Sequence, residues 1–180
     1  LGVIRISAMK HEDKETAGIA ESLSRQMEYL IGSYSCMVPL EKEIGNIREY
    51  FHIMQIQYED RIQLEVSVDE DVMDAIIVKM SLQPIVENAI LHGVKDVTAA
   101  QIIVSAVEYE HDFLISIFNN GNSADKDMVE EMLKSPHRNQ RTFTGMGLYN
   151  VNSRLKMLYG DNYGLIFNEQ VKAGFEIWIR

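Results

Sequence analysis

Residues 82–93 read Leu-Gln-Pro-Ile-Val-Glu-Asn-Ala-Ile-Leu-His-Gly. Pro84 suits the first turn of a helix, where its missing N–H is not needed. Apolar residues at 86, 89 and 90 then face a core, while Asn88 and His92, four residues apart, project from another side. The stretch therefore predicts a helix with an amide and an imidazole on a polar side.

The polar side of this helix has two chemical interpretations. The amide oxygen of Asn88 can bind a hard cation such as magnesium, which takes oxygen ligands and shares substrate phosphates. Glu87 beside it could orient a nucleophile or a water molecule. A Glu-Asn pair on a helix is also typical of a solvated surface, so these two residues alone leave the choice open.

Two glycine-containing segments follow further along the chain. Asn119-Asn120-Gly121 is typical of a turn, and Gly145 and Gly147 stand at the start of a predicted helix. Glycines there let the backbone approach a ligand closely, and the first N–H groups of the helix point at an anion. A lone Gly-x-Gly is also typical of a simple turn, so its order relative to the other segments matters more than the pair itself.

The connection between Gly121 and Gly145 is long for a compact domain, and long connections are often functional. It contains Lys134, Arg138 and Arg141 with no carboxylate among them, which makes a basic patch in an acidic chain. This composition predicts a lid over a phosphate ligand; an ordinary solvated loop is the alternative.

Two helices are predicted before residue 59. Each has an apolar seam at spacings of three and four, formed by Ala20, Leu23, Met27, Leu30 and Tyr34 in the first and by Leu40, Ile44, Ile47, Phe51, Met54 and Tyr58 in the second. Such seams are typical both of an intramolecular core and of a coiled-coil-like dimer contact.

Beyond residue 58 the apolar period changes to two. Ile62, Leu64, Val66 and Val68 alternate with polar residues, which predicts a strand. Strand pairs at 101–107 with 112–118 and at 163–168 with 174–180, separated by helices at 81–93 and 146–159, predict an α+β sandwich. We expect a mixed sheet with helices on one face, preceded by a helical hairpin, with domains at 1–58 and 59–180.

Composition excludes several classes of protein. The 180 residues carry 17 Lys+Arg and 27 Asp+Glu, a net charge of −10, which disfavours general nucleic-acid binding and direct contact with a membrane surface. Cys36 is the only cysteine, so an internal disulfide is excluded. The chain starts at Leu1 with no initiator Met, and we expect it to be a piece of something longer.

In their order along the chain, these segments resemble the ATP-binding domain of the GHKL superfamily. Residues 82–93, residues 145–155 with Tyr159-Gly160, and residues 38–44 with 50–61 are similar to bacterial sensor histidine kinases of the LytS/YesM type. The similarity covers essentially the whole chain. It implies that ATP and Mg²⁺ are bound, and that the γ-phosphoryl group passes to a histidine and then to an aspartate of a response regulator.

The resemblance also implies roles for individual residues. Asn88 would be the magnesium ligand and Glu87 the acid that polarises the phosphoacceptor. The other nucleotide-binding positions that it implies are His92, Lys95, Asn119, Gly121, Arg138, Arg141, Gly145, Gly147 and Leu148. It further implies a homodimer formed through the helical segment, and a cytoplasmic location in a membrane-anchored bacterial protein.

The sequence departs from the family at two points. Asn119 stands where the family has an aspartate that accepts a hydrogen bond from adenine, and losing charge assistance there costs roughly 1 kcal/mol. The family's Pro-His-Phe-type acceptor motif is absent, and we expect it just before Leu1. One alternative is a catalytically degenerate domain that serves as a dimerisation or signalling scaffold; another is an ATPase or serine kinase on the same fold.

Overall fold

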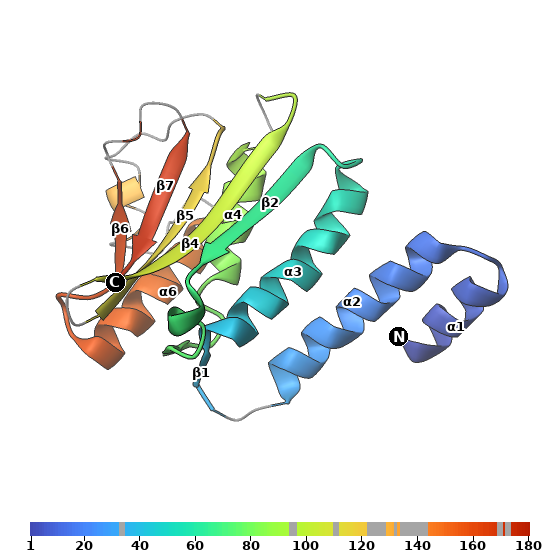
Figure 1. Ribbon diagram of the computed structural model, residues 1–180, viewed down its shortest axis with the longest axis horizontal. Helices are drawn as coiled ribbons and strands as arrows, with labels where there is room; N and C mark the ends of the chain where they lie inside the picture. Colours follow the sequence, from blue (N-terminus) through green and yellow to red (C-terminus); the bar gives the residue numbers. More distant parts are fainter. Residues whose placement is uncertain are drawn as a thin grey trace.

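The computed structural model describes residues 1–32, 35–93, 97–109, 112–121, 129–131, 133, 144–168, 171 and 174–180, apart from the side chains at 92, 144 and 145. The α+β sandwich with a mixed sheet that the sequence predicts is confirmed (Figure 1). Along the described parts of the chain, no helix is both long and apolar enough to span a membrane.

The main sheet has the strand order β2-β4-β5-β7-β6. Its strands are β2 (Ile62–Val68), β4 (Ala100–Tyr109), β5 (Asp112–Asn119), β6 (Leu165–Phe167) and β7 (Phe175–Ile179). β2 and β4 run parallel, and the other neighbours are antiparallel. A separate antiparallel pair, which the sequence did not predict, joins β1 (Met37–Pro39) to β3 (Ile76–Val78), with the short 3-10 helix η1 (Glu70–Val72) between them in the chain.

Helices cover one face of the main sheet. These are α3 (Leu40–Gln57), α4 (Gln83–Gly93) and α6 (Thr144–Tyr159) (Figure 1). Every second residue of the central strands is buried, as in Ile102 and Val104 of β4 and Ile115 and Ile117 of β5. Because side chains alternate across a strand, this burial pattern places a single core between the sheet and the helices.

The helical segment begins with a hairpin of α1 (Gly2–Lys10) and α2 (Lys14–Ile31), which projects beyond α3 (Figure 1). Asp13 caps α2 by accepting a 3.0 Å hydrogen bond from the Thr16 N–H. The Thr16 hydrogen bonds also lower the pKa of the Asp13 carboxyl. The hairpin therefore has a defined turn, although α1 was not among the predicted helices.

The two apolar seams have different partners. Leu40, Ile44, Ile47 and Phe51 of α3 are buried in the core shared with the sheet. Of the described residues of the α2 seam only Ala20 is buried, whereas Leu23, Met27 and Leu30 are 37%, 50% and 52% exposed. Of the two interpretations left open by the sequence, the α3 seam is thus an intramolecular core, and the described part of the α2 seam is mostly uncovered.

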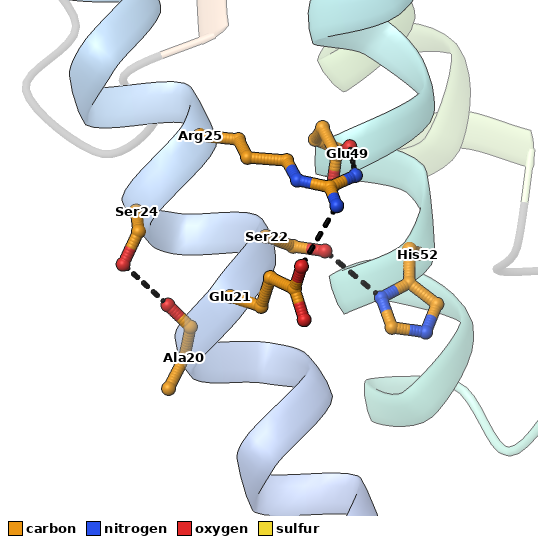
Figure 2. Close-up of polar contacts among 7 residues, drawn as sticks. All are labelled: Ala20, Glu21, Ser22, Ser24, Arg25, Glu49 and His52. Atoms are coloured by element: carbon orange, nitrogen blue, oxygen red, sulfur yellow. Dashed lines mark hydrogen bonds and ion pairs between the residues drawn. The ribbon is translucent and has the colours of Figure 1, made fainter. Parts of the chain in front are cut away.

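Polar side chains join α2 to α3 (Figure 2). Arg25 of α2 forms 2.7 Å ion pairs with Glu21 and with Glu49 of α3. Ser22 Oγ lies 3.0 Å from His52 Nδ1, and a Cβ at Gly18 would lie 3.2 Å from the His52 ring. The two helices therefore pack closely here through specific polar contacts.

Candidate functional site

Asn88 lies near the middle of α4. Ile85, Val86, Ala89 and Ile90 are each at most 1% exposed and fix this helix against the core. Asn88 is only 6% exposed, yet within the described residues its Oδ1 has no hydrogen-bond partner. A buried acceptor left unpaired costs about 1–3 kcal/mol, so this atom suits a cation or a donor from a ligand.

The start of α6 packs against the start of α4. A Cβ at Gly147 would lie 3.1 Å from the Cβ of Pro84, so the helices approach closely because this residue has no side chain. Pro84 and Asn88 are one turn apart and share a side of α4. Pro84 and Gly147 also line a cavity of about 450 Å³. Its other described lining residues are Asn150, Val151, Ser153, Arg154 and Met157, and Asn88 is not one of them.

Asn119 ends β5 beside the other end of α4. Its side chain is fully buried, and neither its Oδ1 nor its Nδ2 has a hydrogen-bond partner among the residues described. A Cβ at Gly93 would lie 3.3 Å from Asn119 Nδ2. A Cβ at Gly174, which has φ +97°, would lie 2.2 Å from the Asn119 carbonyl oxygen, so only glycine fits there.

Three segments that are far apart in the sequence meet at α4 or form part of it: the start of α6, the middle of α4 and the end of β5. At 1.5 Å per residue, α4 rises about 14 Å between Pro84 and Gly93. Gly147 lies at one end of this span and Asn119 at the other, with Asn88 between them. Asn88 Oδ1 and both amide atoms of Asn119 are thus buried and unpaired among the described residues, as are Gln26 Nε2, Asn46 Oδ1 and Arg154 Nε.

The start of α4 is held by a buried carboxylate from α3. Glu43 is fully buried and accepts hydrogen bonds from the backbone N–H groups of Met80, Ser81 and Leu82 at 2.6, 3.0 and 3.0 Å. It also accepts a bond from the hydroxyl of Tyr29 on α2. Burial, then the bond to Glu43, raises the pKa of Tyr29. Glu43 therefore links α2, α3 and the N-terminal end of α4.

A guanidinium from α6 holds the same loop from the other direction. Arg154 donates to the carbonyl oxygens of Lys79 and Met80 at 3.1 and 2.8 Å. Met80 has φ +60°, a left-handed conformation that costs energy for a residue with a side chain. The hydrogen bonds that Glu43 accepts and that Arg154 donates offset this strain and fix the loop that enters α4.

Glu87 is half-buried on the side of α4 that meets α3. It accepts a 2.8 Å hydrogen bond from Gln83 Nε2, and Gln83 Oε1 accepts a 2.7 Å bond from Asn46 Nδ2 of α3. Burial, then the negative charge of Glu87, raises the pKa of Tyr50 on α3. Glu87 therefore belongs to a polar chain that runs back into α3.

Asn152 connects α6 to two neighbouring segments. Its Nδ2 donates to the Leu133 carbonyl oxygen and its Oδ1 accepts from the Leu165 N–H, both at 2.9 Å. The side chain is 5% exposed. Asn152 thereby ties α6 to Leu133, within the long connection, and to the start of β6.

Of the remaining predicted site residues, the structure describes some and not others. Leu148 is buried in the core, and Gly121 is buried just after β5. Gly145 lies in the first turn of α6. Lys95, Arg138, Arg141 and the His92 side chain lie outside the described residues, as does Lys134 of the predicted lid.

Sequence reasoning missed the residues that support the helix. Glu43 and Asn46 were not singled out, although they lie on the apolar stripe of α3 beside Ile44 and Ile47. A carboxylate and an amide on a core-facing stripe are expected only where they have buried partners, and that pattern could have revealed them. Nothing in the spacing of Arg154 or Asn152 indicated their carbonyl and N–H partners.

This chain matches a family model of histidine kinases, and its sequence relatives include sensor proteins and sensor histidine kinases. Residues 1–62 match the model of the Histidine kinase family. The sensor protein LytS of Oceanobacillus iheyensis is 32% identical over 128 residues, 70% of this chain and 22% of that protein. The sensor histidine kinase YesM of Bacillus subtilis is 25% identical over 173 residues, 96% of this chain and 28% of that protein. The chain spans about a quarter of the length of these relatives.

Solved structures agree in fold. The nucleotide-free catalytic domain of histidine kinase ThkA has a TM-score of 0.61 at 15% identity, covering 79% of this chain and 93% of that one. Full-length ShkA in complex with AMPPNP has a TM-score of 0.56 at 15% identity, covering 96% of this chain and 37% of that one. The fold is thus that of histidine kinase catalytic domains, and by its sequence relatives the chain belongs with the sensor histidine kinases of the LytS/YesM type.

Proposed function

We propose that this chain is the ATP-binding catalytic core of a two-component sensor histidine kinase. In this proposal it binds Mg²⁺-ATP along α4, and the γ-phosphoryl group passes to a histidine for relay to an aspartate of a response regulator. The observation that carries the proposal is that Asn88 Oδ1 and both amide atoms of Asn119 are buried without a hydrogen-bond partner in the described part of the protein. Both amides fit a nucleotide with its metal.

The donor set suits phosphoryl transfer, in which a protein mainly positions its reactants and neutralises charge. Asn88 Oδ1 would hold the magnesium ion, which supplies neutralisation of phosphate charge when bound. Asn119 would contact the adenine edge, since an amide can both accept and donate hydrogen bonds. The backbone at Gly145 and Gly147, at the N-terminal end of α6, would face the phosphates.

Glu87 would serve the acceptor histidine. When the imidazole nitrogen attacks, a nitrogen–phosphorus bond forms, the bond from phosphorus to the ADP oxygen breaks, and ADP leaves with that electron pair. The proton on the other ring nitrogen must depart, and the Glu87 carboxylate can accept it. In this proposal Lys95, Arg138, Arg141 and His92 complete the nucleotide site.

A homodimer is part of the same proposal. The exposed apolar side chains of the hairpin are Val3, Ile4, Ile6 and Met9 on α1 and Leu23, Met27, Leu30 and Ile31 on α2. Apolar helical faces of this kind are stable in water when a second helical pair covers them. We propose that two copies of the segment pack as a helical bundle, and that the response regulator is the second protein partner.

Nucleotide binding has a direct test with this chain. A ligand at 100 times its dissociation constant stabilises the folded state by about 2.7 kcal/mol, which raises the Tm of a domain of this size by about 5–10 °C. We expect such a rise with ATP plus Mg²⁺ and a much smaller one with ATP plus EDTA. The absence of any shift at millimolar Mg²⁺-ATP would contradict the proposal.

A further inference from the structure

We propose that Gln83 and Asn46 are positioning residues that hold the Glu87 carboxylate ready for the acceptor histidine. The inference rests on the proposed function, because it gives Glu87 its role in phosphoryl transfer. Its basis is the hydrogen-bonded chain from Asn46 Nδ2 to Gln83 Oε1 at 2.7 Å and from Gln83 Nε2 to Glu87 Oε1 at 2.8 Å. The chain joins α3 to the polar side of α4.

The direction of this chain follows from the chemistry of its members. An ionised carboxylate only accepts hydrogen bonds, so Gln83 must turn its NH₂ group toward Glu87. Its carbonyl oxygen then points the other way and needs a donor, which Asn46 supplies. With Asn46 Nδ2 bonded to its carbonyl oxygen, the Gln83 amide is held in the orientation that suits an ionised Glu87.

Both supports are attached to rigid parts of the protein. Asn46 is 5% exposed and lies in α3 between the core residues Ile44 and Ile47. Gln83 is the first residue of α4, directly after the loop that Glu43 binds through three backbone N–H groups. A side chain oriented by groups on packed helices loses little entropy when it reacts, which is the requirement for a well-placed catalytic group.

The arrangement leaves one oxygen of Glu87 available. Gln83 binds Oε1, and among the described residues no second side chain is hydrogen-bonded to this carboxylate. Tyr50 stands close enough for the Glu87 charge to contribute to its raised pKa. With Oε1 held by Gln83, the other oxygen is the one that would receive the imidazole proton.

Two substitutions test this inference, measured as phosphorylation of the acceptor histidine in the gene product that contains this chain. Gln83→Met keeps the side-chain length but removes both hydrogen bonds. Asn46→Asp replaces a donor by an acceptor, so that Gln83 must turn its carbonyl oxygen toward Glu87. We expect kcat to fall about 10- to 100-fold in each variant, while the KM for ATP changes less than about twofold.

The matched control is another glutamine–glutamate pair on the sheet. Gln101 Nε2 donates to Glu65 Oε2 at 3.2 Å on the surface, so Gln101→Met removes the same kind of bond away from α4. We expect its kcat to match that of the wild type. In a Glu87→Gln background, Gln83→Met should cause no further loss, because a residue that acts only through Glu87 has nothing left to position.

The outcomes separate this inference from the function on which it rests. A normal kcat for Gln83→Met, beside a strongly reduced one for Glu87→Gln, would overturn the positioning role while leaving the kinase proposal intact. Additive losses in the double variant would also overturn it, since they indicate a purely structural effect. A normal kcat for Glu87→Gln would remove the catalytic role of Glu87 itself, and the positioning role with it.

Discussion

Asn119 is the residue at which adenine recognition is most easily tested. Replacing it by aspartate restores charge assistance to a hydrogen bond from the adenine amino group, and charge-assisted bonds are roughly twice as strong as neutral ones. The same change buries a carboxylate at a position with no exposed surface, which destabilises the protein without nucleotide. For Asn119→Asp we therefore expect a lower Tm without ligand and about tenfold tighter ATP binding by calorimetry.

The wild type is the reference for this experiment. If wild-type protein failed to bind and only Asn119→Asp bound ATP, the scaffold alternative would gain over the catalytic one. Looser binding by Asn119→Asp would contradict the proposed contact with adenine.

Gly147 is a second residue with a specific steric role. In Gly147→Ala the new Cβ would lie 3.1 Å from the Cβ of Pro84, which is part of a ring and cannot rotate away. Overpacking costs about 1–3 kcal/mol and exceeds the helix-propensity gain of about 1 kcal/mol. We expect the free energy of unfolding in urea to fall by about 1 kcal/mol.

Gly45→Ala is the matched control, because Gly45 is also helical but its Cβ would meet no atom within 4 Å. The free energy of unfolding of Gly45→Ala should rise by up to about 1 kcal/mol. Equal effects at the two glycines would show that α4 and α6 are not in close contact at Gly147.

At the residue scale, the sequence could predict a polar site residue when the residues near it in the chain show which side of a helix it occupies. Asn88 could be found because its helix has a clear apolar side from which it is excluded. The stripe of α3 could mark Glu43 as a buried carboxylate, but not the partners of Glu43 or of Arg154, because these are backbone groups of a loop far away in the chain. Spacing reports which side of a helix a residue occupies, and says nothing about which loop will fold onto it.

At the scale of elements, the N-terminal end of α4 depends on Glu43. In Glu43→Gln three backbone N–H groups lose a charged acceptor, and an amide N–H₂ is brought toward them. Hydrogen bonds to charged groups contribute about 1.5–3 kcal/mol each, and the losses overlap. We expect the free energy of unfolding in urea to fall by about 3 kcal/mol, with weaker ATP binding because α4 carries Asn88.

Glu41→Gln, at an exposed position in the first turn of the same helix, is the control and should change stability by less than about 0.5 kcal/mol. Similar losses in both variants would point to a general charge effect on α3.

The contact between α2 and α3 should depend on pH. Burial of Glu49 raises its pKa, but the bonds from Arg25 and Ser22 outweigh this and hold the pKa below its ordinary value of 4.5. A lowered folded-state pKa contributes stability above the unfolded value, and that stability is lost as the pH falls through the folded one. At neutral pH the free energy of unfolding of the wild type should exceed that of Glu49→Gln by about 0.5 kcal/mol.

Unfolding curves recorded from neutral pH down to about pH 3 test this, because the difference between the two proteins should vanish at the acid end. A difference that persisted in acid would show that the contact does not depend on the ionised carboxylate. Glu28→Gln, on an exposed position of α2, should match the wild type throughout.

The elements themselves were largely predictable, and the exceptions have a physical cause. The main strands and α2, α3, α4 and α6 follow from apolar periodicity. β1 and β3 are three residues each, too short for a period to develop, and their pairing joins segments on either side of α3. The two helical seams look alike in sequence, and only tertiary packing shows that one faces the sheet and the other does not.

Across the whole molecule, α4 connects the parts. Glu43 and Tyr29 join its start to α3 and α2, Gly147 brings α6 against it, and Asn119 of β5 lies beside its end. A mixed sheet with helices on one face followed from strands alternating with helices. Their convergence on one helix did not, since it depends on contacts between residues up to 75 positions apart, such as Arg154 with Lys79.

Titration calorimetry of Mg²⁺-ATP into the wild-type chain and into Asn88→Ala tests the central claim most directly, with Asn162→Ala, an exposed asparagine beyond α6, as the matched control. The account predicts binding by the wild type and by Asn162→Ala, a loss of at least about tenfold in affinity for Asn88→Ala, and no further loss for that variant when magnesium is removed. Equal affinities for Asn88→Ala and the wild type, or no heat of binding from the wild type at millimolar Mg²⁺-ATP, would contradict it.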